Sequence, residues 1–593
     1  MKSRTSCCNA AVLKRTVFRS LPLWGSYLLC WLVVLPVMIL SRNRWETLLQ
    51  LREFILQTAA NSCHFVAFVY GLAAACVAFS FLYHSRSANF FGALPLRREN
   101  LFVTCYLAGL LLSVGPNLLV ALLSLLAGLL RGMLVGAELA VWLAAQSLTF
   151  VFYYSFAVLL AMIVGHVAAL PGLYVVLNFT AIVVEALIRE LLKSFVYGMW
   201  FDGNFWFSWA SPLYYSLSEG APRVRSVWNE TVMTDCYFEG WKHLLILAAA
   251  GVAFAALAFW FFRRRRMESA GDVIAVRHLK PVFLYGFTIG CSLVLGYLLA
   301  EMLVSGIGSR NFVPVLLCML AGALLGYFVG EMMLHKSVRV FRKRHWVNWA
   351  VTCVVITAAM LCVRLDVFGY SRYVPLAEEV EAVNLTYGET YIADPGMIEE
   401  TLALHQEILD RRTETELAVE NNDVWFNSMY LRYRLKNGKT VSRCYELPCG
   451  AGIDSEPDSL VRQYDALYNN PDYTVLRNLP RDYTAREIES CYLHVNGEEG
   501  IYLSRQEADE FLKTAVEPDL RDSQMGKVYH GSYLEQEPVW MNAYLEVCFT
   551  RAFDSEYGGR SVYLTVTQDA ERTLAYFEGL GLYPQVEEGE KWQ

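Results

Sequence analysis

Long apolar blocks alternate with short polar segments through the first 364 residues of this 593-residue chain. A hydrocarbon core about 30 Å thick is crossed by about 20 helical residues at about 1.5 Å each. Seven blocks of that length contain no Asp, Glu, Lys or Arg, an eighth carries His64 near one end, and a ninth is charged only toward its end. The pattern predicts nine transmembrane helices, at residues 21–40, 63–83, 101–130, 139–164, 171–192, 244–262, 281–300, 312–330 and 346–363.

The fifth block is the weakest, because Glu185, Arg189 and Glu190 fall in its last third. An ionised side chain at the bilayer centre costs about 2.5–3.5 kcal/mol on insertion scales. Near the end of a span such side chains can reach the interface, and Glu185 and Arg189 are spaced to pair on one helical face. We favour this snorkelling interpretation; the alternative is a charge pair that lines a transport path.

Lysines and arginines gather in alternate segments between the predicted spans. If the N-terminus is cytoplasmic, the segments on its side hold 19 basic residues and the longer loops on the other side hold ten. The positive-inside rule therefore predicts a cytoplasmic N-terminus, and nine crossings place residues 365–593 outside the cell. The first block is 20 residues long and no small-residue cleavage site follows it, so it is interpreted as a span and not as a cleaved signal peptide.

The hydrophobicity and charge of the chain differ between its first 364 residues and the remainder. Hydrophobic residues make up 55% of it and the mean hydropathy is +0.32, as expected for a polytopic membrane protein. Residues 1–364 hold 30 basic and 15 acidic residues, whereas residues 365–593 hold 20 and 42. The acidic C-terminal part is long enough to bury a core of its own. We expect a helical membrane region followed by an extracytoplasmic domain.

The C-terminal part shows both helical and strand periodicity, which predicts an α+β domain. Strands are expected near residues 380–386, 425–447, 491–495, 544–550 and 561–567, and helices near 395–411, 458–468, 505–516 and 569–580.

The dipeptide Asn437-Gly438 between alternating segments predicts a hairpin with a two-residue turn. In that register Cys444 lies on the apolar face with Leu431, Tyr433 and Leu435, as a buried thiol; a disulfide to Cys449 is the alternative. The opposite face then carries five cations, which either are neutralised by neighbouring carboxylates or contact an anionic ligand or envelope component. These cations are Arg432, Arg434, Lys436, Lys439 and Arg443.

Motifs for catalysis are missing from the sequence. It contains no G-x-x-x-x-G-K-[ST] phosphate loop, no H-E-x-x-H and no G-x-S-x-G, and its ten histidines show no metal-ligand spacing. We predict no catalytic residue, no metal site, no cofactor and no nucleic-acid partner for this chain. If the chain is a transporter, it needs an energy source, which is either an ATPase in another subunit or an ion gradient. Gradient-driven carriers usually have ionisable residues within their spans, and the spans here are nearly free of charge, which argues against a gradient.

The segment before the third predicted span reads "LPLRRENL". It resembles the L-P-x-[ST]-R-x-x-[LI] pattern after helix two of type-2 ATP-binding-cassette (ABC) exporter permeases, with Arg97 in place of the usual Ser or Thr. The resemblance implies that this turn contacts a cytoplasmic ATPase subunit, which binds ATP and Mg²⁺, and that the permease pairs with a second permease, identical or homologous. The coupling residues it implies are Leu94, Pro95, Arg97, Arg98 and Glu99.

Other features are similar to the same family. A basic amphipathic segment precedes the first span, "SVGPN" places a kink signal at Gly115 and Pro116 inside the long third span, and the aromatic stretch 200–215 occupies the loop where the family has short external helices. The junction after four consecutive arginines, which we interpret as a stop-transfer anchor, resembles that of a bacterial subgroup with three extra spans and an external domain.

The expected organisation is a six-helix permease unit at 1–266, three additional helices at 267–364 and the extracytoplasmic domain at 365–593, in a bacterial plasma membrane. Gly322, Gly326 and Gly330 recur at every fourth residue of the eighth span, which favours close packing against Gly286 and Gly290 of the seventh; a dimer seam is the alternative. The predicted function is the membrane subunit of an ATP-driven exporter of unknown substrate. A membrane-anchored sensor or binding protein is the alternative.

Overall fold

The computed structural model describes the chain except for residues 1–7, 42–46, 85, 88–89, 92–96, 202, 230–231, 266–270, 305–310, 389, 414–424, 451, 498, 532–538, 554–558 and 587–593. The chain divides into two compact units, one formed by residues 1–191 and 204–360 and the other by residues 192–203 and 361–593. Both helical parts expected from the sequence, 1–266 and 267–364, fall mainly in the first unit. Segment 192–203, which the sequence places between two spans, belongs to the C-terminal unit.

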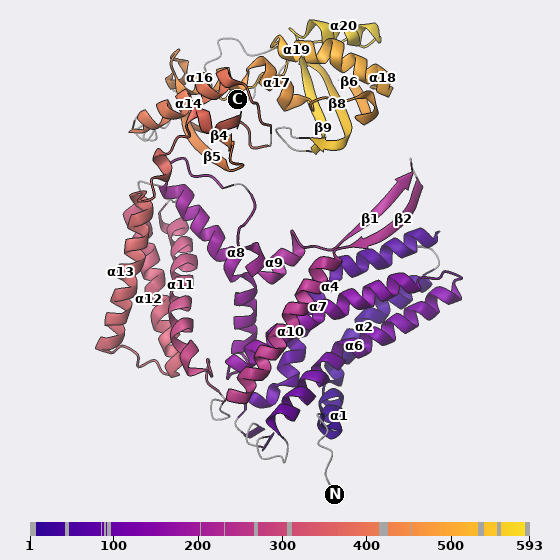
Figure 1. Cartoon of the computed structure of the whole chain (residues 1–593), viewed down its shortest axis with the longest axis vertical. Coiled ribbons are helices and arrows are strands. Elements are labelled where there is room, and N and C mark those ends of the chain that lie inside the picture. The colour runs from indigo at the N-terminus through magenta and orange to yellow at the C-terminus, as the bar shows by residue number, and fades with distance from the viewer. Residues whose placement is uncertain are drawn as a thin grey trace. The chain divides into compact units, whose positions relative to one another are not determined.

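Nine helices in the described part of the chain are long and apolar enough to cross a membrane, in agreement with the nine apolar blocks (Figure 1). The first is Leu21–Leu40, in which α2 (Leu21–Leu32) and α3 (Met38–Leu40) are joined by a π-helical turn at Val33–Val37 that contains Pro36. The others are α4 (Leu48–Ala78), α6 (Arg98–Leu130), α7 (Gly136–Ile163), α8 (Ala169–Phe195), α10 (Trp241–Arg264), α11 (Lys280–Leu303) with the short turn before it, α12 (Phe312–His335) and α13 (Lys343–Arg364).

Helix α4 begins well before the apolar block that predicts it. A capping box closes its N-terminus, with Gln50 N–H donating to the Thr47 hydroxyl and the Gln50 side chain accepting from Thr47 N–H. The first turns contain Arg52, whose guanidinium lies 2.6 Å from the carboxylate of Glu138 on α7. The charged turns are therefore helical although they lie outside the hydrophobic stretch.

Shorter elements complete the first unit. Helix α1 (Ala10–Arg19) precedes the first span, and the short helices at Ser208–Ala210 and α9 (Pro212–Leu217) follow α8. Strands β1 (Arg223–Asn229) and β2 (Val232–Glu239) form an antiparallel hairpin that was not predicted from the sequence. The core of the unit is strongly aromatic: Trp142, Tyr153 and Tyr154 of α7 are fully buried, and Gly71 of α4 packs against the backbone of Tyr153 and Tyr154.

The described residues of the C-terminal unit form two antiparallel sheets, so its α+β character is confirmed. The first has the order β3-β4-β5, from β3 (Val380–Asn384), β4 (Trp425–Leu435) and β5 (Thr440–Cys449), and packs with α14 (Pro395–Asp410), α16 (Leu460–Tyr468) and α17 (Pro471–Asn478). The second has the order β7-β6-β8-β9, from β6 (Ile488–Val495), β7 (Ile501–Leu503), β8 (Trp540–Phe553) and β9 (Gly559–Thr567), with α18 (Arg505–Phe511), α19 (Glu517–Arg521) and α20 (Glu571–Gly579).

Segment 192–203 extends the first of these sheets. Met199 forms an antiparallel bridge with Arg443 of β5, and Cys444 N–H donates to the carbonyl of Gly198. Gly198 has φ +70°, and a Cβ there would meet the ring of Tyr445 at 2.4 Å, so only glycine fits. The segment that follows α8, as far as residue 203, is therefore an integral part of the C-terminal unit.

The β4–β5 hairpin forms as predicted, but its register is one residue away from the expected one. Arg434 pairs with Thr440 and Leu431 with Arg443, because the turn uses three residues with Gly438 at φ +79°. Asn437 keeps a negative φ, which excludes the two-residue turn that needs two positive values. A shift of one residue moves every side chain of β5 to the opposite face.

The predicted basic face is consequently wrong at Arg443. Arg443 lies on the apolar face beside Leu431, where it is fully buried and donates to the carbonyls of Tyr370 and Tyr373. Arg432 stays on the opposite face but is also buried, and donates to the carbonyls of Tyr387 and Gly388. Arg434 is half-buried with its guanidinium 4.0 Å from the ring centroid of Tyr391; the exposed cations of this set are Lys436 and Lys439.

The register also corrects the placement of Cys444. It pairs with Tyr430 on the face that carries Arg432 and is half-buried, not on the apolar face of Leu431. Cys444 and Cys449 are both free thiols, as are the other cysteines in the described ranges. The alternative disulfide is therefore not formed.

Candidate functional site

The charged turn before the third span is described only in part. Leu94 and Pro95 lie outside the described residues, while Arg97 is the N-cap of α6 and Arg98 and Glu99 form its first turn, all three exposed. Glu99 is a favourable residue at a helix N-terminus, where the backbone dipole attracts negative charge.

Two contacts join this turn to the end of α10. The carboxylate of Glu99 lies 3.2 Å from Arg263, and Arg98 donates to the carbonyl of Arg265 over 3.3 Å. The Glu99–Arg263 pair is about half exposed on both sides, so it contributes at most about 1 kcal/mol. The geometry nonetheless places the start of one span beside the end of another, with Arg98 and Arg265 separated by 167 residues in sequence.

Arg265 is not a free anchor charge of the kind that a stop-transfer segment suggests. Its side chain is buried and donates to the carbonyls of Ala161 and Met162, at 2.6 and 3.1 Å. These are carbonyls of the last turn of α7, which lack helical partners and attract cations. Through Arg98 and Arg265, the ends of α6, α7 and α10 form one connected group.

Pro116 interrupts the hydrogen bonds of α6 without ending the helix, which is continuous from Arg98 to Leu130. A proline has no N–H, so the carbonyl of Leu112, four residues earlier, loses its helical partner. The hydroxyl of Tyr70 on α4 donates to this carbonyl over 2.9 Å. Gly115 has no atom within 4 Å of the position of a Cβ, so the predicted kink signal lies beside open space.

A small polar cluster surrounds this break. Tyr27 of α2 stacks on Tyr70 with ring centroids 4.1 Å apart, and its hydroxyl donates to the Asn117 side chain over 2.8 Å. Asn117 in turn donates to the hydroxyl of Ser113. Helices α2, α4 and α6 therefore share buried hydrogen bonds at the one proline inside α6.

Tyr27 and Tyr70 also line a groove of about 700 Å³ between α2 and α4. Most of its lining is apolar, and its amides and hydroxyls come mainly from one face of α4, at Gln57, Thr58, Asn61 and Ser62. A mostly apolar groove with a few polar groups is typical of sites that hold amphiphilic molecules.

The charge pair of the fifth span does not snorkel. Glu185 and Arg189 are both buried, with their side chains 2.5 Å apart. The Glu185 carboxylate accepts from the backbone N–H groups of Trp206 and Phe207, both at 2.8 Å, and Arg189 donates to the carbonyl of Asn204. The pair therefore fixes the segment after residue 203 onto α8.

The glycines of the eighth span face α11. A Cβ at Gly322 would meet the Cys291 carbonyl at 2.8 Å, and one at Gly326 would meet Cys291 Cβ at 2.5 Å; one at Gly330 would meet Leu284. The prediction that Gly286 and Gly290 of α11 face these glycines is wrong. A Cβ at either position would meet no atom of another element within 4 Å, whereas one at Gly296 would meet the Cα of Met319 at 2.7 Å.

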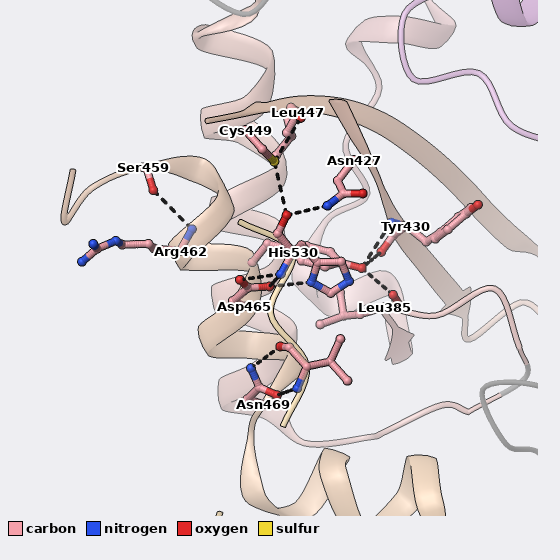
Figure 2. A network of polar contacts seen from close by, with 12 residues as sticks. Leu385, Asn427, Tyr430, Leu447, Cys449, Ser459, Arg462, Asp465, Asn469 and His530 are labelled. Carbon is pink, nitrogen blue, oxygen red and sulfur yellow. Dashed lines mark hydrogen bonds and ion pairs between the residues drawn. The ribbon is translucent and has the colours of Figure 1, made fainter. Parts of the chain in front are cut away.

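In the C-terminal unit, Figure 2 shows His530 at the centre of a polar network. Its ring Nδ1 lies 2.5 Å from the carboxylate of Asp465 on α16, and its carbonyl accepts from Asn427 and from the thiol of Cys449. Burial raises the pKa of Cys449 to about 11, so the thiol is protonated and is not a nucleophile. Asn469 adds two hydrogen bonds to Val528, and the network holds segment 528–530 on α16.

A group of metal-ligand residue types lies at the end of α12, where the sequence predicted none. Glu331, His335 and His345 present ligand atoms that all lie within 4.8 Å of one another. The spacing of Glu331 and His335, four residues apart on a helix, is visible in the sequence and could have indicated part of this group. The approach of His345 from another helix could not be predicted from the sequence.

Comparison with protein-family models, with curated protein sequences and with solved structures finds no match to this chain.

Proposed function

We propose that the chain is the membrane subunit of an ATP-driven ABC exporter. The observation that carries this proposal is the exposed turn Arg97–Arg98–Glu99 at the start of α6, connected through Arg98 and Arg265 to the ends of α7 and α10. A subunit that pushes on this turn would displace the ends of three spans together. Such a point of contact is what a transporter needs when its energy source is a separate protein.

In the proposed assembly, two permeases, identical or homologous, combine with two cytoplasmic ATPase subunits that bind ATP and Mg²⁺. The N-terminus lies in the cytoplasm of a bacterial cell, the nine apolar helices cross the plasma membrane, and the C-terminal unit is outside. The side chains of Arg97, Arg98 and Arg263 then lie on the cytoplasmic side, as the positive-inside rule requires. The ATPase can change the conformation of the permease only if it binds two states of the permease with different free energies.

The groove between α2 and α4 is the proposed place for a substrate or lipid. Its apolar lining with a row of amides and hydroxyls suits an amphiphile with an apolar body and a small polar group. The polar cluster at Pro116 borders this groove through Tyr27 and Tyr70, so a movement of α6 would alter its shape.

Charge reversal at the proposed contact tests the assignment. Arg98→Glu and Arg97→Glu should each reduce the amount of copurified ATPase at least tenfold, which corresponds to about 1.4 kcal/mol of binding free energy. Arg339→Glu is the matched control, an exposed arginine of the predicted cytoplasmic side that lies after α12. The variants should elute as the wild type does in size-exclusion chromatography, which separates lost contact from misfolding.

Normal copurification and normal stimulated hydrolysis in the Arg97 and Arg98 variants would contradict the proposal. The alternative function, an anchored extracytoplasmic sensor or binding protein, is favoured by the size of the C-terminal unit and its use of segment 192–203. It predicts that no ATPase copurifies with the wild-type chain.

A further inference from the structure

The cluster at the end of α12 joins two consecutive helices. Glu331 and His335 lie on the last turns of α12, and His345 lies on the first turn of α13. His345 Nδ1 is 2.8 Å from Glu331 Oε1, and His335 Nε2 is 3.2 Å from Glu331 Oε2. The two imidazoles thus approach the two oxygens of one carboxylate from different sides, with ring centroids 5.8 Å apart.

The fold holds these three residues together for reasons that do not depend on a ligand. Helix α12 stops directly after His335 because Lys336 adopts a left-handed conformation with φ +51°. The chain that follows α12 packs on Phe328 of that helix. The ring centroid of Phe328 lies 5.0 Å from that of Phe341 and 4.7 Å from that of Trp346. His345 is the neighbour of Trp346 and is therefore placed by this apolar contact.

The distances suit a tetrahedral metal ion. With ligand bonds of about 2.0–2.2 Å, two ligand atoms of a tetrahedral site lie about 3.4 Å apart. The two N···O separations are 2.8 and 3.2 Å, and the three ligand atoms all lie within 4.8 Å of one another, so side-chain rotations are needed to bring them to that spacing. Two imidazoles and one carboxylate are a donor set that binds Zn²⁺, with a fourth position left for water.

The surroundings show the features that support such a site. The hydroxyl of Tyr327 donates to Glu331 Oε1 over 3.1 Å and orients the carboxylate, as outer-shell groups do around metals. The side chain of Glu331 is 6% exposed, that of His345 17% and that of His335 60%. One side is therefore open for entry of the ion. Lys336, which follows His335 directly, is held 2.7 Å from Asp272.

We propose that Glu331, His335 and His345 form a Zn²⁺ site that fastens the end of α12 to the start of α13. The ion would replace the hydrogen bonds that link the carboxylate to the two rings and would fix the turn at 336–342. This inference goes beyond the proposed export function and does not depend on it.

The test uses the full chain, purified in detergent with an affinity tag that contains no histidine and stripped of metal by a chelator. Titration with Zn²⁺ against a chromophoric competitor should show one site per chain. His335→Ala should weaken it by at least about 100-fold, the upper end of what loss of an outer-shell partner costs. Tyr327→Phe should weaken it by about tenfold on the same basis. His335 is chosen because it is largely exposed, so its removal leaves the metal-free fold intact.

His278→Ala is the matched control, an exposed histidine that precedes α11. Addition of Co²⁺ should give the intense visible absorption of a four-coordinate ion in the wild type and in His278→Ala, and a loss of that absorption in His335→Ala. Equal weakening in the two histidine variants, no stoichiometric Zn²⁺ binding by the wild type, or a weak six-coordinate Co²⁺ spectrum would each overturn the proposal.

Discussion

The hydrogen bond from Tyr70 to Leu112 gives a prediction whose size follows from the missing N–H of Pro116. In Tyr70→Phe the Leu112 carbonyl keeps neither a helical nor a side-chain donor, and an unpaired buried polar group costs about 1–3 kcal/mol. The phenyl ring retains the stacking on Tyr27, so little else changes. In Pro116→Ala the new N–H can close the helical bond to Leu112. Tyr70→Phe should then cost only about 0.5–1 kcal/mol in that background.

The assay is a double-mutant cycle on the full chain, with the free energy of unfolding measured by denaturant titration in mixed micelles. The expected coupling between positions 70 and 116 is about 0.5–2 kcal/mol, the difference between the two costs of Tyr70→Phe. Tyr174→Phe is the control, because Tyr174 donates to the carbonyl of Phe68, which has a non-proline residue, Leu72, four positions later. Equal costs of Tyr70→Phe in both backgrounds would refute the reasoning.

Three further predictions concern a buried ion pair, a buried histidine and a hairpin turn. Glu185→Gln leaves Arg189 buried without its carboxylate and should lower unfolding free energy by about 3–5 kcal/mol, against less than about 0.5 kcal/mol for the exposed Glu190→Gln; similar losses would contradict this. Burial, with help from Arg443, lowers the pKa of His405 to about 3. Since that pKa is below the unfolded value, the C-terminal unit should lose stability as pH falls below about 6.5, by up to about 1.4 kcal/mol per pH unit. Hydrogen exchange of α14 between pH 7.5 and 5.5 measures this loss, which His405→Gln should abolish. Gly438→Ala should destabilise the β4–β5 hairpin by about 1–2 kcal/mol, seen as faster exchange of its amides; unchanged exchange would exclude the left-handed turn.

The long apolar helices could be predicted from the sequence because their length is set by the thickness of a bilayer and their composition by its chemistry. The block 312–330, for example, contains no charged residue, and the helix that includes it is Phe312–His335. The extension of α4 back to Leu48 could not be predicted in this way, since Arg52 is accommodated by Glu138 on another helix.

In the β4–β5 hairpin the two strands were predicted correctly, but the residues of β5 were assigned to the wrong face of the sheet. Alternation and the Asn437-Gly438 dipeptide predict both strands, but the turn length decides which residues of β5 face inward. The use of three turn residues in place of two exchanged the positions of Arg443 and Cys444. Neighbouring sequence does not distinguish these turns, whereas the burial of Arg443 against Tyr370 does.

Sites made from separate helices were the least predictable. The link between Arg98 and Arg265, and that between Tyr70 and Leu112, join residues 167 and 42 positions apart. The Glu185–Arg189 pair was identified as a pair, but its burial depends on Trp206 and Phe207, which the helix pattern of α8 does not include.

The proposed coupling of this chain to an ATPase through the start of α6 can be tested directly. The most direct measurement is the quantity of ATPase that copurifies with the chain from its native membrane in mild detergent, for the wild type, Arg98→Glu and Arg339→Glu. We expect an ABC ATPase in equimolar amount with the wild type and the Arg339 variant, and at least a tenfold loss with the Arg98 variant. No ATPase with the wild type, or the same amount with all three chains, would contradict it.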